Sequence, residues 1–439
     1  MSVGFWCERA WLGDGIAERV LVRCDEDITE VAVGVDPPAD ADRLPGVVFP
    51  GIANGHSHAF HRALRGRTHG NGGTFWTWRD GMYALAGRLD PDSYYRLARL
   101  VYGEMVLAGY TAVGEFHYLH HGPGGVRYAD PNAMGVALIE AAKDAGIRIT
   151  LLDVLYLAGG LDGGGYRALA GPQLRFGDGD LDGWLDRVGG LTEAGHARVG
   201  ASLHSVRAVP VEFLGSFAGH VRDRAVHVHL SEQVAENEAC QALHGCSPTE
   251  LLADNGLLGP WTTAVHATHL SDVDVRLLGA GSVTACFCPT TEADLADGIG
   301  PARELADAGC PIGLGSDQHA VIDAFGEARA LEYGERLRSG RRGRFGPGEL
   351  VASATWCGYN SLGWLGGGRI AVGSPCDLVA VRTDTVRTAG VAAGELVMAA
   401  GSSDVDTVVV GGRVVVRAGR HVRLGTVGAE LAAVIEELW

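Results

Sequence analysis

Three histidines lie within six residues in the stretch NGHSHAFH at 54–61, directly after an apolar run at 47–52. His56 and His58 are two residues apart, so on an extended chain both side chains project to the same face. Two imidazoles on one face can hold a single metal ion, as they do in zinc sites. The pair is a weak signal alone, because two histidines can also be hydrogen-bonded residues of a turn. A metal centre would require further ligands from elsewhere in the chain.

The middle of the chain predicts a barrel that could supply such ligands. Short apolar runs alternate there with longer helix-like segments, which is typical of parallel βα units. Helical candidates include 93–109, 130–146 and 247–256, the last beginning with Ser-x-x-Glu. The apolar runs are 47–52, 111–116, 148–155, 198–203, 225–230, 263–267, 282–287 and 311–315. Eight repeats predict an α/β fold, a (β/α)8 TIM barrel with its active site at the C-terminal ends of the strands.

The two ends of the chain share a different pattern. Residues 17–36 alternate apolar and polar side chains between turn formers, as half-buried antiparallel strands do. Residues 375–381 read as a strand, and 405–416 as a hairpin around Gly411 and Gly412. We therefore expect both ends to form one small β-sandwich domain. The expected boundaries are 1–48 and 371–439 for this domain and 49–370 for the barrel.

Polar side chains follow six of the eight predicted strands, where the barrel fold places an active site. The third and seventh runs offer less. A glycine-rich stretch at 158–182 follows the third run, and the sequence leaves open whether it is a mobile lid or a plain surface loop. The polar residues are, in strand order, His56 and His58, His117 and Tyr118, His204 and Arg207, His229 and Glu232, His266 and His269, and Asp317.

The combination of a His-x-His pair, a lone histidine at another strand and an aspartate in Gly-Ser-Asp resembles the metal site of the amidohydrolase superfamily. The resemblance extends over almost the full chain. It implies one divalent metal ion, most often zinc and by ligand type also iron, bound by His56, His58, His229 and Asp317. A two-metal branch of the superfamily uses a carboxylated lysine at strand four. The single lysine here, Lys143, precedes the third run, so we expect one metal.

The segment His229-Leu230-Ser231-Glu232 is similar to the His-x-x-Glu of the deaminase branch of that superfamily. In this branch the glutamate shuttles protons and does not bind the metal. His266, in Val-His-Ala-Thr-His, matches the histidine of strand six. The resemblance thus implies catalytic roles for Glu232, His266 and Asp317, acting on a metal-activated water whose pKa falls to about 7.

Longer stretches resemble the formimidoylglutamate deiminases, which in histidine degradation convert N-formimino-L-glutamate and water into N-formyl-L-glutamate and ammonia. The stretches are NGHSHAFHRAL at 54–64, FWTWRDGMY at 75–83, EFHYLHH at 115–121, LHSVRAV at 203–209 and HLSEQ at 229–233. The resemblance implies that the substrate, an amidine with two carboxylates, is bound by His61, Arg79, Tyr118, His204 and Arg207. Two residues depart from the family pattern: Gly55 replaces a common leucine, and His61 replaces a common glutamine, with a charge expected to vary near about pH 6.5.

Composition indicates which binding partners and which cell compartment to expect. The net charge of −17 disfavours nucleic acid and anionic membranes, and no run of about 18 apolar residues indicates a membrane span. The nine cysteines are scattered without a CxxC pair, and the N-terminus lacks a secretory pattern, so we expect reduced thiols in a cytoplasmic protein. We also expect a homodimer.

Two other classes of function stay open. One is a mononuclear deaminase or chlorohydrolase of a heteroaromatic ring such as guanine, cytosine, an adenosine-like nucleoside or a triazine. Such an enzyme would favour stacking aromatics where this chain has His204 and Arg207. The other is a non-catalytic barrel, which would be expected to lose metal ligands that this chain retains.

Overall fold

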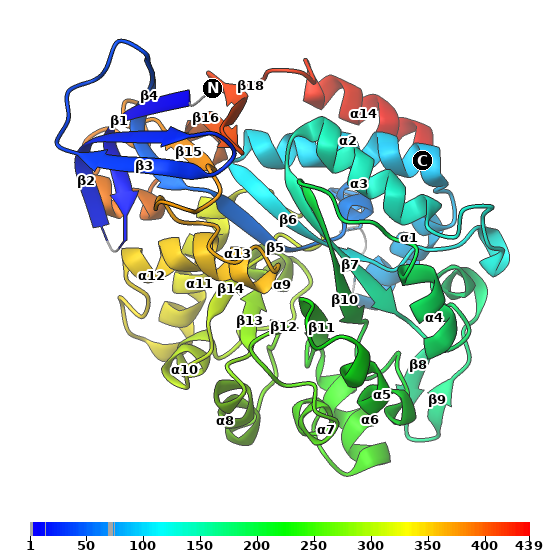
Figure 1. Ribbon diagram of the computed structural model, residues 1–439. Helices are drawn as coiled ribbons and strands as arrows, with labels where there is room; N and C mark the ends of the chain where they lie inside the picture. The colour runs from blue at the N-terminus through cyan, green and yellow to red at the C-terminus, as the bar shows by residue number, and fades with distance from the viewer. Residues whose placement is uncertain (1–2, 14, 69–72, 74) are drawn as a thin grey trace.

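The computed structural model describes residues 3–13, 15–68, 73 and 75–439. Two eight-stranded sheets organise these residues, one a parallel barrel and one built from both ends of the chain (Figure 1). A third, two-stranded sheet consists of β8 (Gly160–Asp162) and β9 (Gly165–Arg167). The barrel with an attached sheet is the fold class that the sequence predicts.

The barrel strands are parallel and follow one another in sequence order. Backbone hydrogen bonds close the barrel between its last and first strands, where the amides of Ser316 and Asp317 donate to the His56 carbonyl at 3.1 and 3.0 Å. The closure therefore joins the His-x-His segment to the Gly-Ser-Asp segment. The strands are β5 (Ile52–Ser57), β6 (Tyr110–His117), β7 (Arg148–Leu155), β10 (Ala197–Leu203), β11 (Val226–Leu230), β12 (Thr262–His266), β13 (Thr284–Phe287) and β14 (Ile312–Leu314).

The first barrel strand differs from the prediction. Most of the run 47–52 belongs to β4 (Ala41–Pro50), a strand of the other sheet, and the barrel begins only at Ile52. Gly51 lies between the two strands, and a Cβ there would come within 2.7 Å of Asp377, Tyr359 and Thr111. A glycine is needed at this crowded crossing from one sheet to the other. His56 consequently lies within a strand instead of following one.

The seven other predicted strands agree with the structure to within about two residues at each end. The helices surround the barrel (Figure 1), and the predicted Ser-x-x-Glu capping box is formed by Ser247 and Glu250 at the start of α7. The helices are α1 (Phe75–Ala86), α2 (Pro91–Leu107), α3 (Ala133–Ala145), α4 (Leu181–Val188), α5 (Val211–His220), α6 (Val234–His244), α7 (Pro248–Asp254), α8 (Asp272–Ala280), α9 (Pro289–Asp294), α10 (Ala302–Asp307), α11 (Ala324–Ser339), α12 (Pro347–Ala352), α13 (Gly358–Ser361) and α14 (Val427–Leu438).

The second sheet joins the two ends of the chain in the order β18-β17-β16-β15-β4-β1-β2-β3. It has an apolar core of its own that includes Phe5, Val22, Leu378 and Val409. The predicted turn at Gly411 and Gly412 connects β16 and β17, with φ of 55° and 72°, values that favour glycine. The strands are β1 (Val3–Leu12), β2 (Gly15–Cys24), β3 (Ile28–Val33), β4 as above, β15 (Leu378–Val381), β16 (Val405–Val410), β17 (Arg413–Arg417) and β18 (Arg420–His421).

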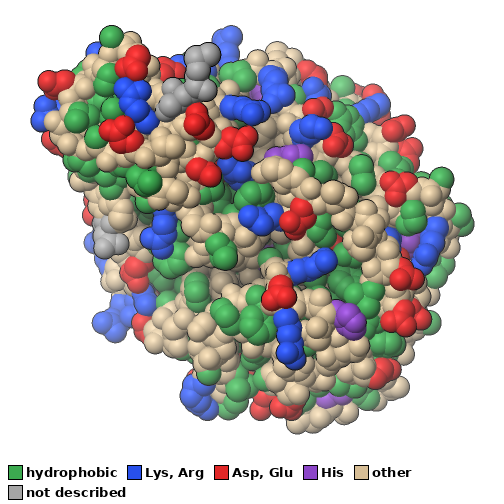
Figure 2. Space-filling view, in the orientation of Figure 1, with side chains coloured by type: hydrophobic (Ala, Val, Ile, Leu, Met, Phe, Trp, Pro, Cys, Tyr) green, Lys and Arg blue, Asp and Glu red, His purple; other side chains and the backbone are tan. Residues whose placement is uncertain are grey.

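The surface carries charges of both signs. Figure 2 shows acidic and basic side chains interspersed over this face, so the net charge of −17 is not gathered there into one acidic patch. Within the described part of the chain, no helix combines the length and the apolar character needed to cross a membrane.

Candidate metal centre and active site

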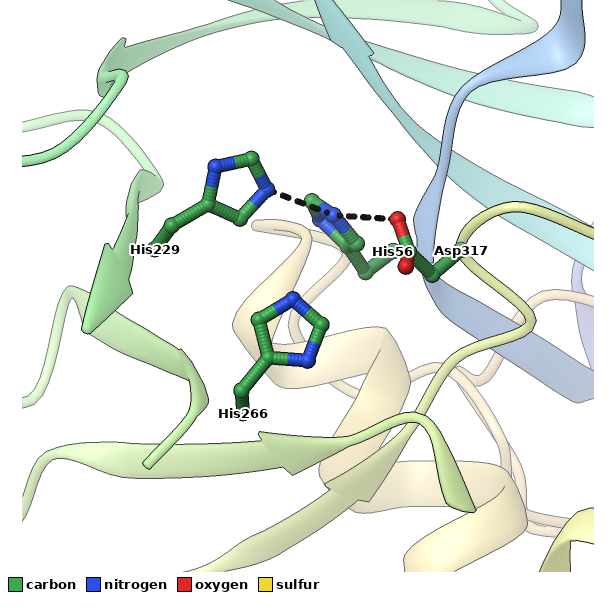
Figure 3. A group of neighbouring side chains, drawn as sticks. All are labelled: His56, His229, His266 and Asp317. Atoms are coloured by element: carbon green, nitrogen blue, oxygen red, sulfur yellow. Dashed lines mark hydrogen bonds and ion pairs between the residues drawn. The ribbon is translucent and has the colours of Figure 1, made fainter. Parts of the chain in front are cut away.

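The closing seam of the barrel brings His56, His58 and Asp317 together. The Nε2 atom of His56 lies 3.3 Å from Asp317 Oδ1, and that of His58 lies 3.2 Å from the same oxygen. His229, at the end of β11, approaches from across the barrel, with its Nε2 atom 3.0 Å from His56 Nε2. Figure 3 shows His56, His229 and Asp317 of this group, together with His266. All four residues implied as metal ligands thus lie in one cluster.

A fifth residue, His266 from the end of β12, belongs to the same cluster. Ligand atoms of His56, His229, His266 and Asp317 all lie within 4.8 Å of one another. His58 groups with His61 and Asp317 by the same measure. Four candidate ligands therefore converge on one point, with His58 next to them through Asp317, and His266, expected as a catalytic residue, is one of the four.

The donor set fits a cation. The Nδ1 atom of His58 lies 3.0 Å from the Phe116 carbonyl, which can only accept, so this nitrogen carries a proton and Nε2 is the atom left to face the cluster. Burial lowers the pKa of His56 to about 3 and that of His229 well below its usual range, which keeps both rings neutral. Lone pairs on facing nitrogens 3.0 Å apart repel each other unless a proton or a metal ion lies between them. Neutral imidazoles with one carboxylate are the donors that zinc prefers.

Asp317 supplies the negative charge of the cluster. Burial alone would raise its pKa, but the close approach of His56 and His58 outweighs burial and holds the pKa of Asp317 well below its usual range. The backbone is strained here, since Asp317 has a φ of 40° and His266 a φ of 70°, in the left-handed region that non-glycine residues seldom occupy. Such conformations persist where surrounding contacts enforce them, and they are concentrated at functional sites.

Close packing explains the glycine at position 55. A Cβ on Gly55 would lie 3.0 Å from Cys286 Sγ and 3.1 Å from the Leu314 carbonyl oxygen. A Cβ on Gly315 would lie 2.9 Å from both His56 Cβ and Cys288 Sγ. A leucine at position 55, common in the family, would therefore require its neighbours to shift. Cys286 in β13 and Cys288, directly after that strand, are buried and free.

His266 connects the cluster to two glutamates. Its Nε2 atom lies 3.8 Å from Glu232 Oε1, and its Nδ1 atom lies 3.4 Å from Glu292 Oε1. Burial opposes protonation of the ring, but the surrounding carboxylates outweigh it and raise the pKa of His266 well above its usual range. His266 can therefore act as a hydrogen-bond donor toward the centre of the cluster.

Glu292 was not predicted from the sequence, because no functional residue was expected after the seventh predicted strand. It lies in α9, directly after β13, and the Cys288 amide donates to its Oε1 at 2.8 Å. The only sequence signal was its position shortly after the strand, in Pro-Thr-Thr-Glu, where barrel enzymes collect functional groups.

A pocket opens above the cluster, and all five residues expected to bind substrate line it. Among the described lining residues, the acidic side chains are Glu232 and Asp317, both beside the metal cluster. The cationic ones are Arg79 from α1 and Arg207 from the segment after β10. The described residues that line the pocket are His58, His61, Trp78, Arg79, Met82, Tyr83, Tyr118, Tyr156, Phe176, His204, Arg207, His229, Glu232, His266, Leu295 and Asp317. The stretch 75–83, which supplies Trp78, Arg79, Met82 and Tyr83, also contains Phe75 and Trp76, whose side chains lie outside the described residues.

Arg207 is backed by a buried carboxyl group. Its Nε atom lies 3.9 Å from Glu236 Oε2, and the Glu236 side chain is buried. Burial raises the pKa of Glu236 to about 7, although Arg207 acts against this shift. The guanidinium of Arg207 therefore keeps donors available for an anion in the pocket.

His61 corrects one expectation. The sequence suggested a charge that varies near neutral pH, but burial lowers the pKa of His61 well below its usual range and the ring stays neutral. Its Nε2 atom lies 2.9 Å from the Tyr118 hydroxyl, and its ring packs 4.5 Å from that of His58 between centroids. A neutral imidazole can thus occupy the position of an uncharged glutamine without adding charge.

The glycine-rich stretch 158–182 is partly built into the pocket. It contains the hairpin of β8 and β9 and a short 3-10 helix, η3 (Gly171–Arg175). The Arg175 side chain donates to the carbonyls of His121 at 2.7 Å and Leu89 at 2.6 Å, and also to that of Ala86. Phe176 is buried and lines the pocket. This part of the stretch is a wall of the site and not a plain surface loop.

Comparison with known proteins agrees with this architecture. A sequence profile of the amidohydrolase family matches residues 47–415. Formimidoylglutamate deiminase of Pseudomonas aeruginosa is 38% identical over 437 residues, which cover 95% of both chains. The crystal structure of an amidohydrolase from Brucella melitensis superposes with a TM-score of 0.90 at 32% identity, covering 99% of each chain.

A more distant structure shares the fold. An adenosine deaminase from Xanthomonas campestris with bound zinc has a TM-score of 0.84 at 20% identity, and the match covers 99% of this chain and 97% of that one. The chain belongs to the amidohydrolase family, whose members are metal-dependent hydrolases. Within that family it is similar to formimidoylglutamate deiminase over nearly its whole length.

Proposed function

We propose that the protein hydrolyses N-formimino-L-glutamate to N-formyl-L-glutamate and ammonia. The observation that carries this proposal is the separation of charge in the pocket. Its acidic lining residues are Asp317, which is part of the metal cluster, and Glu232, which lies 3.8 Å from His266, while the cationic ones, Arg79 and Arg207, contact Tyr83 and Glu236. A formimino group is a protonated amidine at neutral pH, and the rest of the substrate carries two carboxylates. A pocket with carboxylates beside the reacting centre and guanidinium groups elsewhere complements both parts.

The metal would be held by His56, His58, His229 and Asp317, with His266 close to the same point. Zinc is the ion that this donor set favours, and iron is the alternative. The bound zinc in the similar adenosine deaminase structure supports this choice. When bound, such an ion acts as a Lewis acid that activates a water molecule.

The surrounding residues transfer the protons and orient the attacking water. Glu232 pairs with the amidinium, accepts a proton from the attacking water and delivers it to the terminal nitrogen, which departs as ammonia. His266, oriented by Glu292, donates a hydrogen bond to the oxygen that attacks the formimino carbon. Asp317 accepts a hydrogen bond from the same water and orients it. The carbon–nitrogen bond to glutamate stays intact, so the second product is the N-formyl amide.

The substrate carboxylates would be held by the donors of the pocket. The planar guanidinium of Arg207 can bind a carboxylate through two parallel hydrogen bonds. Arg79, Tyr118, His204 and His61 are the other expected contacts, and His61 and Tyr118 are hydrogen-bonded to each other. The expected homodimer and cytoplasmic location stay predictions from the sequence.

One substrate panel tests the proposal. Ammonia release by the zinc-loaded protein is measured with N-formimino-L-glutamate, guanine, cytosine and adenosine. We expect turnover of the first compound alone. The ring enzymes are the competing class, and the aromatic lining of Trp78, Tyr118, Tyr156 and Phe176 is the feature that would suit them. Turnover of a nucleobase that rivals that of formiminoglutamate would reject the proposal and leave the metal centre in place.

A further inference from the structure

Two tyrosines of the pocket are joined by one buried amide. Gln173 of η3 donates from Nε2 to the Gly159 carbonyl and to the Tyr83 hydroxyl, each at 3.1 Å, and lies 3.4 Å from the Tyr156 hydroxyl. Its Oε1 atom accepts from the Ala170 amide at 3.4 Å. A backbone carbonyl can only accept and a backbone amide can only donate, so these two contacts fix the orientation of the Gln173 side chain.

This orientation leaves a donor for the pocket. Nε2 has two hydrogens, and the Gly159 carbonyl takes one of them, so the other is donated to the nearer hydroxyl, that of Tyr83, which keeps its own hydrogen. The two hydroxyls lie close enough to influence each other, and a contact between them would use at most one of their two hydrogens. Burial raises the pKa of Tyr156 above its usual range, so the phenol stays neutral. One hydroxyl hydrogen has no acceptor among the described residues, and both tyrosines line the cavity.

The surroundings of the tyrosines favour an anion. The guanidinium carbon of Arg79 lies 5.6 Å from the centre of the Tyr83 ring, and Arg207 lines the same cavity beside Tyr156. The lining carboxylates Glu232 and Asp317 belong to the metal cluster. A hydroxyl donor in a cavity that two guanidinium groups also line is suited to an acceptor from outside the protein, and a carboxylate matches both the donor and the positive charge.

The amide that joins the tyrosines is firmly anchored. Next to Gln173, the carbonyl of Arg175 accepts from the backbone amides of His120 and His121 at 3.1 and 2.9 Å, and the Arg175 side chain holds three backbone carbonyls. Gln173 itself is only 9% exposed. Because the Gln173 side chain is already held in place, less conformational entropy is lost when a ligand binds to the hydroxyl groups that it positions.

We propose that Tyr83 and Tyr156, positioned by Gln173, form a second carboxylate subsite that makes the pocket selective for dicarboxylates over monocarboxylates. This inference rests on the proposed function for the identity of the substrate, but the subsite itself can be tested without turnover. Tyr83 and Tyr156 would contact the ligand directly, and Gln173 would act as a positioning residue through their hydroxyls.

The first test measures binding of simple probes to the zinc-loaded protein by calorimetry. Glutarate carries two carboxylates, and butyrate carries one. We expect Tyr83→Phe and Tyr156→Phe to weaken glutarate binding, at least one of them by about tenfold or more, the scale of a lost hydrogen bond to a charged group. Butyrate binding should change by less than about twofold if its single carboxylate binds Arg207. Tyr333→Phe, at an exposed tyrosine on α11, is the matched control.

A second test examines the role of Gln173. Gln173→Leu should reduce the ratio of glutarate affinity to butyrate affinity, as the tyrosine variants do. In the double variant with Tyr83→Phe, Gln173→Leu should reduce glutarate affinity by less than it does alone, because both residues act through one hydrogen-bond network. A merely structural role would lower both affinities together. If Gln173→Leu fails to fold, the two tyrosine variants still decide the question.

The outcomes separate this inference from the proposed function. Wild-type protein that binds glutarate no better than butyrate, or tyrosine variants that both keep wild-type glutarate affinity, would overturn the subsite. In the activity assay we expect Tyr83→Phe to raise KM for N-formimino-L-glutamate more than it lowers kcat. Failure of the wild type to release ammonia from that compound, with glutarate binding that still depends on Tyr83, would overturn the function and leave the subsite standing.

Discussion

The Nε2 atoms of His56 and His229 face each other at 3.0 Å across the C-terminal end of the barrel, and both rings are buried. His56 comes from the first barrel strand and His229 from the fifth, so the contact spans the width of the barrel. A single ion between these nitrogens would link strands that share no backbone hydrogen bonds. Metal binding should therefore affect both activity and stability.

Metal content gives the first prediction. The purified wild type should hold about one tightly bound divalent ion per chain, because His56, His229 and His266 converge on Asp317 and the His58 group shares that same carboxylate. His229→Asn should reduce the bound metal to below about one tenth of that amount and lower the midpoint of thermal unfolding. Elemental analysis and calorimetry measure the two effects. The control is His220→Asn, at an exposed histidine. Two equally tight ions per chain would contradict the single-metal site.

The role of Glu232 gives the second prediction. Glu232→Gln keeps the size of the side chain and removes the proton acceptor, so kcat should fall at least about 100-fold, the lower range for general acid–base catalysis. Metal content should not change. Steady-state kinetics and elemental analysis on the same samples check both statements, with the exposed Glu238→Gln as control. Loss of the metal in Glu232→Gln would instead identify Glu232 as a ligand.

Arg207 gives the third prediction. Arg207→Met removes a charge-assisted contact and leaves the substrate carboxylate in a protein of net charge −17. Truncation of such a contact costs about 2 to 5 kcal/mol, so kcat/KM for N-formimino-L-glutamate should fall about 30-fold to several thousand-fold. Arg222→Met, at an exposed arginine, should be close to wild type. An equally mild effect at both positions would show that Arg207 does not bind the substrate.

The buried Glu327 of α11 gives a prediction about pH. Burial raises the pKa of Glu327 to about 8 from an ordinary value of 4.5, and among the described residues its hydrogen-bond donors are both from Thr290. Between pH 4.5 and about 8 the folded protein holds a proton that the unfolded chain has lost. Stability should therefore decrease as pH rises through this window.

Glu327→Gln should remove that part of the pH dependence. Thermal unfolding midpoints of the wild type and the variant, measured at intervals from pH 5 to about 8, give the comparison. We expect the difference between them to shift in favour of the variant as pH rises. Glu8→Gln, at an exposed glutamate, is the control. A constant difference across the range would mean that Glu327 does not titrate there.

Much of the fold could be predicted because both periodicities are strong. The apolar runs and the helical segments between them identify seven barrel strands, and the Gly411-Gly412 turn identifies the hairpin of the second sheet. The first strand was misplaced because residues 47–52 are apolar throughout, and an unbroken apolar run does not show which of two sheets it joins. The turn at Gly51 depends on Asp377 and Tyr359, which are remote in sequence.

The site was predictable only in part, because several of its contacts also join residues that are remote in sequence. Residues with a motif, such as the His-x-His pair, could be found because their spacing is local. Glu292 acts through His266, and Gln173 acts through Tyr83 and Tyr156, and these pairings exist only in the folded barrel. The neutral state of His61 likewise follows from its burial, which its sequence neighbours do not reveal.

The most direct measurement of the central claim is an analysis of the products. The zinc-loaded protein is incubated with N-formimino-L-glutamate, and the products are quantified by mass spectrometry together with an ammonia assay. Proton delivery by Glu232 to the terminal nitrogen predicts equal amounts of N-formyl-L-glutamate and ammonia, formed at least about 100-fold more slowly in the matched Glu232→Gln sample. Formation of glutamate with formamide, or no conversion by a fully metal-loaded protein, would contradict the account.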